Sequence, residues 1–413
     1  MIALDSKTSI YVAQHICSLA YMLNNIIDRD EILDKLLSTL TQRDLKSNYA
    51  LIGPRRIGKT MILEELESRL AKKNVIATRI DFGNYSYNPK EFSQVLVDSL
   101  TEAYQRALDP TSRLLAQLKN AITEIKKLRR MRLEFDLTFD ESGKPVYTLR
   151  PTLAKEEPQY VESFAEGFSY ASRLADVSKK KVVVILDEAQ KIVEWINLSG
   201  MKSVMDQFRS IIDRLGEVSL VLSGSRVHML ESVFGEAGSP LFGRFTLMKV
   251  GPLEEQDAIT LYLRYALGAD TGEAKEVYQL VGGHPFYLKV MAEARRPQES
   301  IADKYRRLLT EVTGGLYLYV NYILHEDVGS RIMETYYVKI IKALAYGEMK
   351  ISEIALRIGA EAPWLPRYLT KLIEFDLVKK TNGTYELPDQ IVRDYFRLNY
   401  PEEAPSSEET MAS

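Results

Sequence analysis

Cysteine is nearly absent from this sequence, and its scarcity excludes two kinds of stabilisation. Cys17 is the one cysteine among 413 residues, so neither an intramolecular disulfide nor a cysteine zinc cluster can form. Cys17 lies among apolar residues, and we expect it to be a small core residue. The chain also lacks a charge excess, since 54 Lys and Arg face 57 Asp and Glu. Charge therefore does not by itself indicate a nucleic-acid partner.

Long apolar runs are missing as well. No stretch approaches the length of a membrane span, and the start Met1–Asp5 lacks the basic-then-apolar pattern of a signal peptide. We therefore expect a cytoplasmic protein without a membrane partner. Apolar residues make up 46% and charged residues 27%, which is typical of soluble globular proteins. The length is enough for two or three domains.

The chain is organised around a glycine-rich loop that matches the pattern G-x-x-x-x-G-K-[ST]. An apolar run at residues 49–52 predicts a strand before it, and helical spacing follows it. In this arrangement the backbone N–H groups of the loop and the helix N-terminus face phosphates, and the two glycines permit close approach. The lysine is expected to reach the β- and γ-phosphates, and the threonine to offer its hydroxyl to Mg²⁺. The loop consists of Gly53, Pro54, Arg55, Arg56, Ile57, Gly58, Lys59 and Thr60.

A second motif is the aliphatic run at residues 182–186, which ends in Asp187 and Glu188. Such a run predicts a strand buried on both faces, as in a parallel sheet. Asp187 lies where a carboxylate can hold the Mg²⁺ shell. Glu188 lies where a general base for an attacking water is needed. Together with the loop upstream, these residues predict a site where Mg²⁺ and a bound phosphate chain meet an activated water.

Three further apolar runs, at residues 75–81, 218–222 and 245–250, predict two strands after the loop and a last strand near residue 250. Five strands with intervening helices give an α/β fold, a parallel P-loop NTPase sheet with its site at the carboxyl ends of the strands. Ser223 lies at the tip of one strand, where it either senses the γ-phosphate or orients the attacking water, or else belongs to a plain strand-end turn. Arg244 precedes the last strand, and we expect it near the phosphate edge, where it could stabilise transition-state charge within its own chain or across an oligomer boundary.

Two residues outside these motifs are candidates for contact with the nucleotide base. Arg29 begins a helix predicted to run to about Leu40, and it either contacts the base or is solvated. Pro285 ends a Gly-Gly-His-Pro turn before a helix and could lie against the base. We expect His284 of this turn to be a packed or capping residue rather than a catalyst.

The remaining segments predict a multidomain arrangement. Helices at 337–344, 351–358 and 363–375, followed by an Asn-Gly hairpin, predict a winged helix-turn-helix at 331–400. Its last helix could contact DNA, but residues 351–400 hold seven positive and seven negative side chains. That balance favours a protein-contact or structural module. The other predicted units are an N-terminal helical extension (1–25), a core (26–250) with a hairpin insertion (131–149), a helical region (251–330) and a disordered acidic tail (401–413).

Taken together, these motifs resemble the archaeal-type AAA+ ATPases of the STAND class, the signal-transduction ATPases with numerous domains. The resemblance implies a P-loop core, a helical lid and a winged helix. It also implies ATP binding through Lys59 and Thr60, Mg²⁺ at Asp187, Glu188 as the base and a Gly-x-Pro turn near adenine. Members act as ATP-dependent switches, which implies a protein client of unknown identity. The resemblance spans roughly residues 26–400 and is carried by the loop 53–60 and by segments 27–30, 186–190, 223–225, 239–244 and 283–285.

Overall fold

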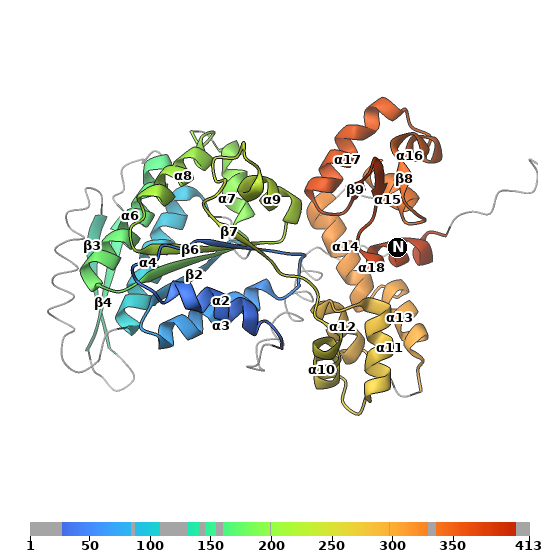
Figure 1. Cartoon of the computed structure of the whole chain (residues 1–413), viewed down its shortest axis with the longest axis horizontal. Helices are drawn as coiled ribbons and strands as arrows, with labels where there is room; N and C mark the ends of the chain where they lie inside the picture. The colour runs from blue at the N-terminus through green and yellow to red at the C-terminus, as the bar shows by residue number, and fades with distance from the viewer. Residues whose placement is uncertain are drawn as a thin grey trace, which may run out of the picture.

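Two halves of different construction make up the molecule (Figure 1). The computed structural model describes residues 27–83, 87–107, 131–139, 145–153, 160–198, 200–296, 298–328 and 336–401. The described residues up to 250 form an α/β half built on one central sheet, which we call the sheet half. The described residues from 251 to 401 form the helical half. The predicted N-terminal extension and all but the first residue of the predicted acidic tail lie outside the described residues.

The central sheet of the sheet half has five parallel strands in the order β2-β5-β6-β1-β7. β1, which precedes the glycine-rich loop, lies between β6 and β7, so Ile52 pairs with Gly224 on one side and Lys249 on the other. The predicted parallel α/β sheet is therefore confirmed. The strands are β1 (Tyr49–Ile52), β2 (Ile76–Asp81), β5 (Val182–Asp187), β6 (Val218–Gly224) and β7 (Thr246–Lys249).

Both faces of this sheet are covered by helices, which explains its continuous aliphatic runs. In β5, Val183 and Ile185 pack toward one face, whereas Val182, Val184 and Leu186 pack toward the other. The first face is covered by α2 (Asp30–Leu40) and α3 (Lys59–Lys72). The second face is covered by α4 (Pro89–Arg106), α6 (Tyr160–Ser178), α7 (Gln190–Glu194), α8 (Val204–Arg214) and α9 (Val227–Gly235).

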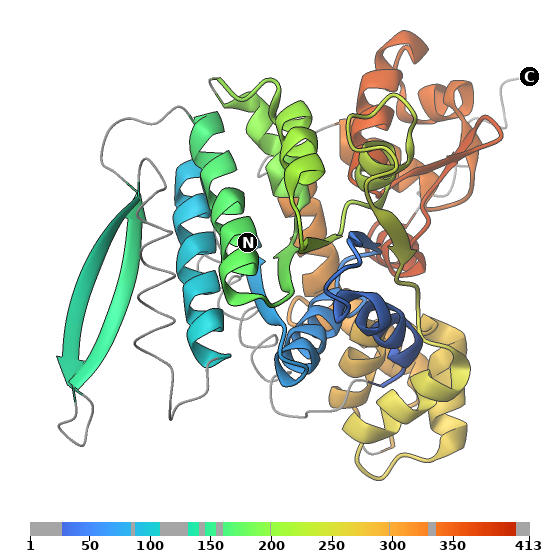
Figure 2. The same ribbon diagram turned by 60° about the vertical axis from the view of Figure 1, so that its left-hand side comes forward.

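A two-stranded hairpin extends from the sheet half beside α4 (Figure 2). Its strands β3 (Met131–Phe139) and β4 (Pro145–Leu153) pair antiparallel, with Phe139 opposite Pro145. A hairpin was predicted at 131–149; the paired strands lie at 131–139 and 145–153, and the predicted turn at 140–143 is outside the described residues.

The helical half begins with five helices and ends with four helices and a small sheet in the order β8-β10-β9. The three helices and the hairpin predicted between 337 and 387 are present, and Asn382 and Gly383 both have the positive φ of a tight hairpin turn. The elements are α10 (Glu255–Tyr265), α11 (Thr271–Val281), α12 (Pro285–Glu293), α13 (Ile301–Thr310), α14 (Gly315–Val328), α15 (Tyr336–Leu344), β8 (Met349–Lys350), α16 (Ile351–Ile358), α17 (Leu365–Glu374), β9 (Lys379–Thr381), β10 (Thr384–Glu386) and α18 (Gln390–Asn399).

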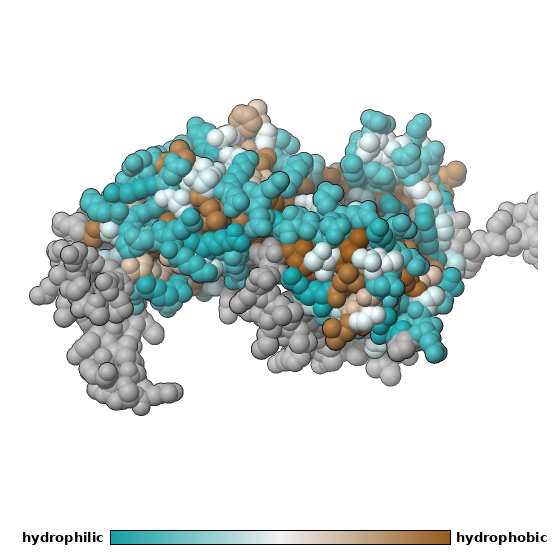
Figure 3. All heavy atoms as spheres, turned by 60° about the horizontal axis from the view of Figure 1, so that its bottom comes forward, coloured by the Kyte–Doolittle hydropathy of each residue, from teal (hydrophilic) through white to brown (hydrophobic). Residues whose placement is uncertain are grey.

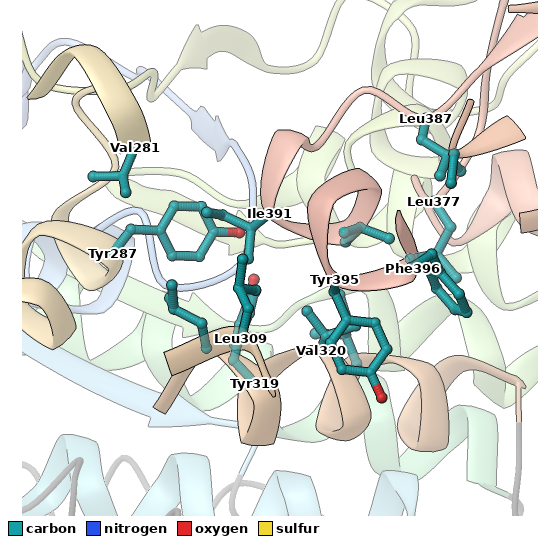
Figure 4. Packing of buried hydrophobic residues seen from close by; sticks show 14 of the residues in the cluster. Val281, Tyr287, Leu309, Tyr319, Val320, Leu377, Leu387, Ile391, Tyr395 and Phe396 are labelled. Atoms are coloured by element: carbon teal, nitrogen blue, oxygen red, sulfur yellow. The ribbon is translucent and has the colours of Figure 1, made fainter. Parts of the chain in front are cut away.

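One hydrophobic core runs through the whole helical half. Tyr287 and Tyr319 of the first five helices lie in the same buried cluster as Ile391 and Tyr395 of α18 (Figure 4). α18 packs against α13 and α14. The regions predicted as separate units, 251–330 and 331–400, therefore share their core.

The surface fits this arrangement. On the face drawn in Figure 3, hydrophilic residues cover most of the sheet half. Hydrophobic residues gather over part of the helical half, in the region of its first helices. Within the described part of the chain, no helix combines the length and apolarity needed to cross a membrane.

Candidate active site

The glycine-rich loop connects β1 to α3 at the carboxyl edge of the sheet. Gly53 lies so close to β7 that a Cβ there would be 2.3 Å from the carbonyl oxygen of Val250. Gly58 caps α3 with a φ of 103°, which a side chain would strain. Both glycines are thus required where the sequence predicted them. Arg56 also has a positive φ, 58°, and its side chain is described below.

Lys59, the first residue of α3, directs its side chain back toward the start of this loop. Its side chain is 4% exposed, and its Nζ donates hydrogen bonds of 2.8 Å to the carbonyl oxygens of Gly53 and Pro54. Burial lowers the pKa of Lys59, and the nearby carboxylates of Glu188 and Asp187 oppose that shift. The loop therefore holds a buried ammonium group in the position expected for phosphate binding.

Asp187 is the last residue of β5, and its carboxylate accepts hydrogen bonds from side chains of two other elements. Its Oδ2 accepts a 2.8 Å hydrogen bond from the hydroxyl of Thr60 on α3. Its Oδ1 accepts hydrogen bonds from the hydroxyl of Ser223 on β6 and from the N–H of Glu188. The structure thus brings together three of the predicted site residues from three elements. Ser223 contacts Asp187 directly, so it is more than a plain strand-end turn.

The oxygens of Thr60 and Asp187 fit a magnesium ion. Mg²⁺ takes hard oxygen ligands and is usually bound by one or two protein oxygens together with substrate phosphates and waters. Within the described ranges, no group of three or more His, Cys, Asp or Glu could hold a metal by itself. A metal at this edge would therefore depend on the phosphates of a bound nucleotide.

Glu188 is held beside Asp187 by two residues for which no role was predicted. Its backbone has a φ of 55°, and its Oε2 accepts hydrogen bonds from the hydroxyl of Ser225, at 2.9 Å, and from the side-chain amide of Gln190. Both residues belong to segments that carried the family resemblance, 186–190 and 223–225, which was the available signal. Their contacts fix the orientation of the predicted base.

Two further charged residues, both on β2, border this site. Asp81 pairs in register with Asp187 on the neighbouring strand, and burial raises the pKa of Asp81. The guanidinium of Arg79 lies 3.8 Å from Oδ2 of Asp187. The sequence predicted this strand, but it did not show that β2 and β5 are neighbours, so both residues were missed.

The helical half contacts the loop at both of its arginines. The ring Nε2 of His284 lies 3.1 Å from the carbonyl oxygen of Arg55, which places a proton on Nε2. The same ring stacks on Tyr287 with centroids 4.1 Å apart. His284 is thus a packed residue, as predicted. The guanidinium of Arg56 lies 4.3 Å from the ring centroid of Phe286 and 5.1 Å from that of Tyr319.

A second contact joins the end of the helical half to the strand end that carries Ser223 and Ser225. The carboxylate of Asp376, just after α17, accepts hydrogen bonds from the N–H groups of Val227 at 2.6 Å and His228 at 3.0 Å. These are the first residues of α9. The guanidinium of Arg226 lies 5.0 Å from the ring centroid of Phe375.

The two candidates for base contact lie at the junction of the halves. Arg29 is buried, and its Nη2 donates a 2.7 Å hydrogen bond to the carbonyl oxygen of Gly251, where the helical half begins. It is therefore not a solvated arginine. Pro285 is the first residue of α12, directly after His284.

The prediction that Arg244 lies near the phosphate edge is wrong for its own chain. Thr246 pairs with Tyr49 at the amino end of the parallel strands, and the carbonyl oxygen of Arg244 accepts a 3.3 Å hydrogen bond from Asn48, the residue before β1. The glycine-rich loop lies at the other edge. The guanidinium of Arg244 forms an ion pair with Asp213, at 3.2 Å.

Comparison with known proteins agrees with this geometry. A family model described as an ATPase domain predominantly from Archaea matches residues 26–291. An uncharacterized protein of Methanocaldococcus jannaschii is 25% identical over 236 residues, 54% of this chain and 50% of that protein. The chain thus spans about half the length of this curated relative.

Two solved structures resemble the chain as well. The Walker-type ATPase of Pyrococcus abyssi has a TM-score of 0.58 at 20% identity, with 90% of this chain and 96% of that chain covered. The Aeropyrum pernix ORC2 protein has a TM-score of 0.45 at 11% identity, with 89% and 92% covered. At 20% identity, the similarity to the Pyrococcus abyssi ATPase shows a shared fold and nothing more.

Proposed function

Because this chain belongs to the family of ATPase domains found predominantly in Archaea, we propose that it is a Mg²⁺-dependent, ATP-hydrolysing switch of the STAND type. ATP bound at residues 53–60 closes a helical lid, residues 251–330, on the sheet half, and hydrolysis releases it. A winged helix at 331–400 passes this change to a protein client.

One observation carries the proposal: the phosphate-binding loop is in contact with the lid. The backbone of Arg55 meets His284, and the side chain of Arg56 lies against Phe286. A triphosphate in the loop would draw the Lys59 ammonium away from the carbonyl groups of Gly53 and Pro54. Any rearrangement of the loop then acts directly on the helix that begins at Pro285.

The hydrolytic step uses the carboxylates of β5. Thr60 and Asp187 would hold Mg²⁺, which neutralises phosphate charge when bound. Glu188 accepts a proton from the attacking water, and Ser225 and Gln190 keep its carboxylate oriented. Ser223 keeps Asp187 in place through its hydrogen bond.

The three remaining candidate residues, Arg29, Pro285 and Arg244, lie outside the group formed by the loop and the β5 carboxylates. Arg29 and Pro285 would lie near the adenine base, where the two halves meet. Arg244 lies at the opposite edge of the sheet, so it could reach a phosphate only in a second copy of the chain. A role in turnover for Arg244 therefore requires an oligomer.

The first test separates binding from hydrolysis. In Glu188→Gln the loop and the Mg²⁺ ligands remain, so ATP affinity should stay within about 3-fold while hydrolysis falls by about 100-fold or more, since the base is lost. Calorimetry gives the affinity, and phosphate release gives the rate. Glu102→Gln, an exposed glutamate on α4, is the matched control and should hydrolyse ATP like the parent. Equal rates in Glu188→Gln and the parent would overturn Glu188 as base. The same variant with ATP also provides a trap for capturing the client.

DNA binding through residues 363–375, the alternative prediction, gains no specific support. Lys371 is paired with Glu374 at 2.8 Å. The guanidinium of Arg367 lies over the rings of Trp364 and Tyr368. The cations of this helix are thus engaged within the domain.

A further inference from the structure

We propose that Arg79 is the counter-ion of Asp187 when no metal is bound, and that it sets how much Mg²⁺ the site requires. On nucleotide binding, Mg²⁺ replaces Arg79 at Asp187, and Arg79 keeps the two glutamates of α3 that it already contacts as its partners. The inference rests on the proposed function, because it concerns the metal that accompanies the nucleotide. It adds a positioning residue that the loop and the carboxylate motif do not contain.

The position of Arg79 follows from the pairing of β2 with β5. Arg79 lies opposite Ile185, two residues before the aligned pair Asp81 and Asp187. Its side chain lies on the face of the sheet that α3 covers. From there Nη1 lies 3.8 Å from Oδ2 of Asp187, and Nη2 donates a 3.0 Å hydrogen bond to Oε1 of Glu64. Nε lies 3.9 Å from Oε2 of Glu67.

Asp187 needs a counter-ion in this setting. The residue is 1% exposed, and an uncompensated buried charge is strongly destabilising. Its hydrogen bonds come from the neutral hydroxyls of Thr60 and Ser223 and from a backbone N–H. The ammonium of Lys59 is close enough to Asp187 to interact with its charge, but it donates its hydrogen bonds to loop carbonyls. Among the described residues, Arg79 is the cation that lies within 4 Å of this carboxylate.

Mg²⁺ and Arg79 compete for the same atom. Thr60 and Arg79 both face Oδ2 of Asp187, so a metal held by Thr60 and Asp187 would lie close to the guanidinium. Two cations at one carboxylate oxygen repel each other. Glu64 and Glu67 already contact Arg79 from α3 and offer it other partners without a large movement. Arg79 therefore opposes metal binding at Asp187, and Glu64 attracts the Arg79 guanidinium away from Asp187.

Two substitutions should shift the Mg²⁺ requirement in opposite directions. In Arg79→Met the competing cation is gone, so the Mg²⁺ concentration for half-maximal ATP binding should fall by about 5-fold, the change that corresponds to about 1 kcal/mol of removed repulsion. In Glu64→Gln, Arg79 is left with Asp187 as its stronger partner, so the concentration should rise. The measurement is calorimetric ATP binding at a series of Mg²⁺ concentrations, which requires no hydrolysis.

A thermal-unfolding measurement separates this role from plain structural support. Arg79→Met should unfold at a lower temperature than the parent without Mg²⁺ and ATP, and the difference should shrink when both are added. The control is Arg69→Met, because Arg69 pairs with Glu65 at 2.7 Å on the same helix and has no contact with Asp187. It should leave the Mg²⁺ requirement unchanged.

The outcomes are distinguishable. A parent that binds ATP in a Mg²⁺-dependent way, with Glu64→Gln shifting the requirement downward or not at all, would overturn this inference alone. Glu64→Gln keeps Arg79 in place, so this result is available even where Arg79→Met does not fold. A parent whose nucleotide binding is absent or indifferent to Mg²⁺ would overturn the proposed function, and this inference with it.

Discussion

The two halves of the molecule use buried polar groups in different ways. In the sheet half one group of them lies at the carboxyl edge, where β5 ends with the buried Asp187, β6 carries the buried Ser223 near its end, and β2 ends beside them with the partly buried Asp81. In the helical half they lie inside the core, where tyrosine hydroxyls donate to carboxylates of the last helix region. Tyr287 donates to Asp389, and Tyr305 donates to Asp394 at 2.7 Å.

This contrast indicates which part of the molecule moves when the nucleotide binds. The hydrogen bonds of Tyr287 and Tyr305 join α12 and α13 to α18 and its cap, so the helices before residue 330 and those after it are joined through their shared core. The sheet half meets them through contacts of the loop, of Arg29 and of α9. We therefore expect the helical half to move as one unit relative to the sheet, with the change centred near residue 251 rather than near residue 330.

The largest expected effect comes from the edge of the sheet half. Lys59→Ala removes the ammonium from the loop and should weaken ATP binding by about 100-fold or more, since charge-assisted bonds to phosphate are lost. Calorimetry with Mg²⁺ and ATP measures the change. Lys72→Ala, at the exposed far end of the same helix, should bind like the parent. Unchanged affinity in Lys59→Ala would contradict the assignment of this edge as the nucleotide site.

The next effect tests whether the helical half is one unit. Tyr287→Phe removes the hydroxyl that donates to the partly buried Asp389, which should lower the free energy of unfolding by about 1–3 kcal/mol. Urea unfolding measures the loss. Tyr336→Phe, at a tyrosine that is 39% exposed, is the control. A single transition for residues of the lid and of the last domain supports one unit, whereas two separated transitions would argue for a boundary near 330.

The smallest effect concerns the junction of the halves and depends on pH. Burial lowers the pKa of His284 to about 4, and the cations Lys59 and Arg56 act in the same direction. The unfolded chain binds a proton near the ordinary value of 6.5, whereas the folded chain does not, so stability falls as pH decreases from 6.5 toward 4.

His284→Gln should remove this loss, which amounts to about 1 kcal/mol at pH 5.5. The measurement is urea unfolding of parent and variant at pH 7.0 and 5.5. His325→Gln, at an exposed histidine of α14, should keep the pH dependence of the parent. If His284→Gln also keeps it, the histidine is not enclosed at the junction.

Local patterns were enough to predict much of the sheet half. Aliphatic runs predicted the five strands, and the spacing of Gly53, Gly58 and Lys59 predicted the loop. The pattern did not give the strand order, which brings Arg79 beside Asp187. For Arg244 the sequence did hold the signal that was missed, because a residue that precedes a strand of a parallel sheet lies at its amino edge.

The helical half was predicted less completely for a physical reason. Amphipathic spacing shows which face of a helix is buried, but it does not show which other helix covers that face. The sequence therefore gave the helices around Pro285 and before the hairpin at Asn382 without showing that they share one core. The bond between Tyr287 and Asp389 joins residues 102 positions apart, beyond the reach of any local pattern.

The contact made by Asp376 has a consequence for how freely its partner helix can vary. Both hydrogen bonds that the carboxylate accepts at positions 227 and 228 come from main-chain N–H groups. Nearly any amino acid at these two sites would preserve the attachment. Proline is the exception, because it has no N–H to donate, so a scan of both positions should tolerate broad replacement and reject that one residue.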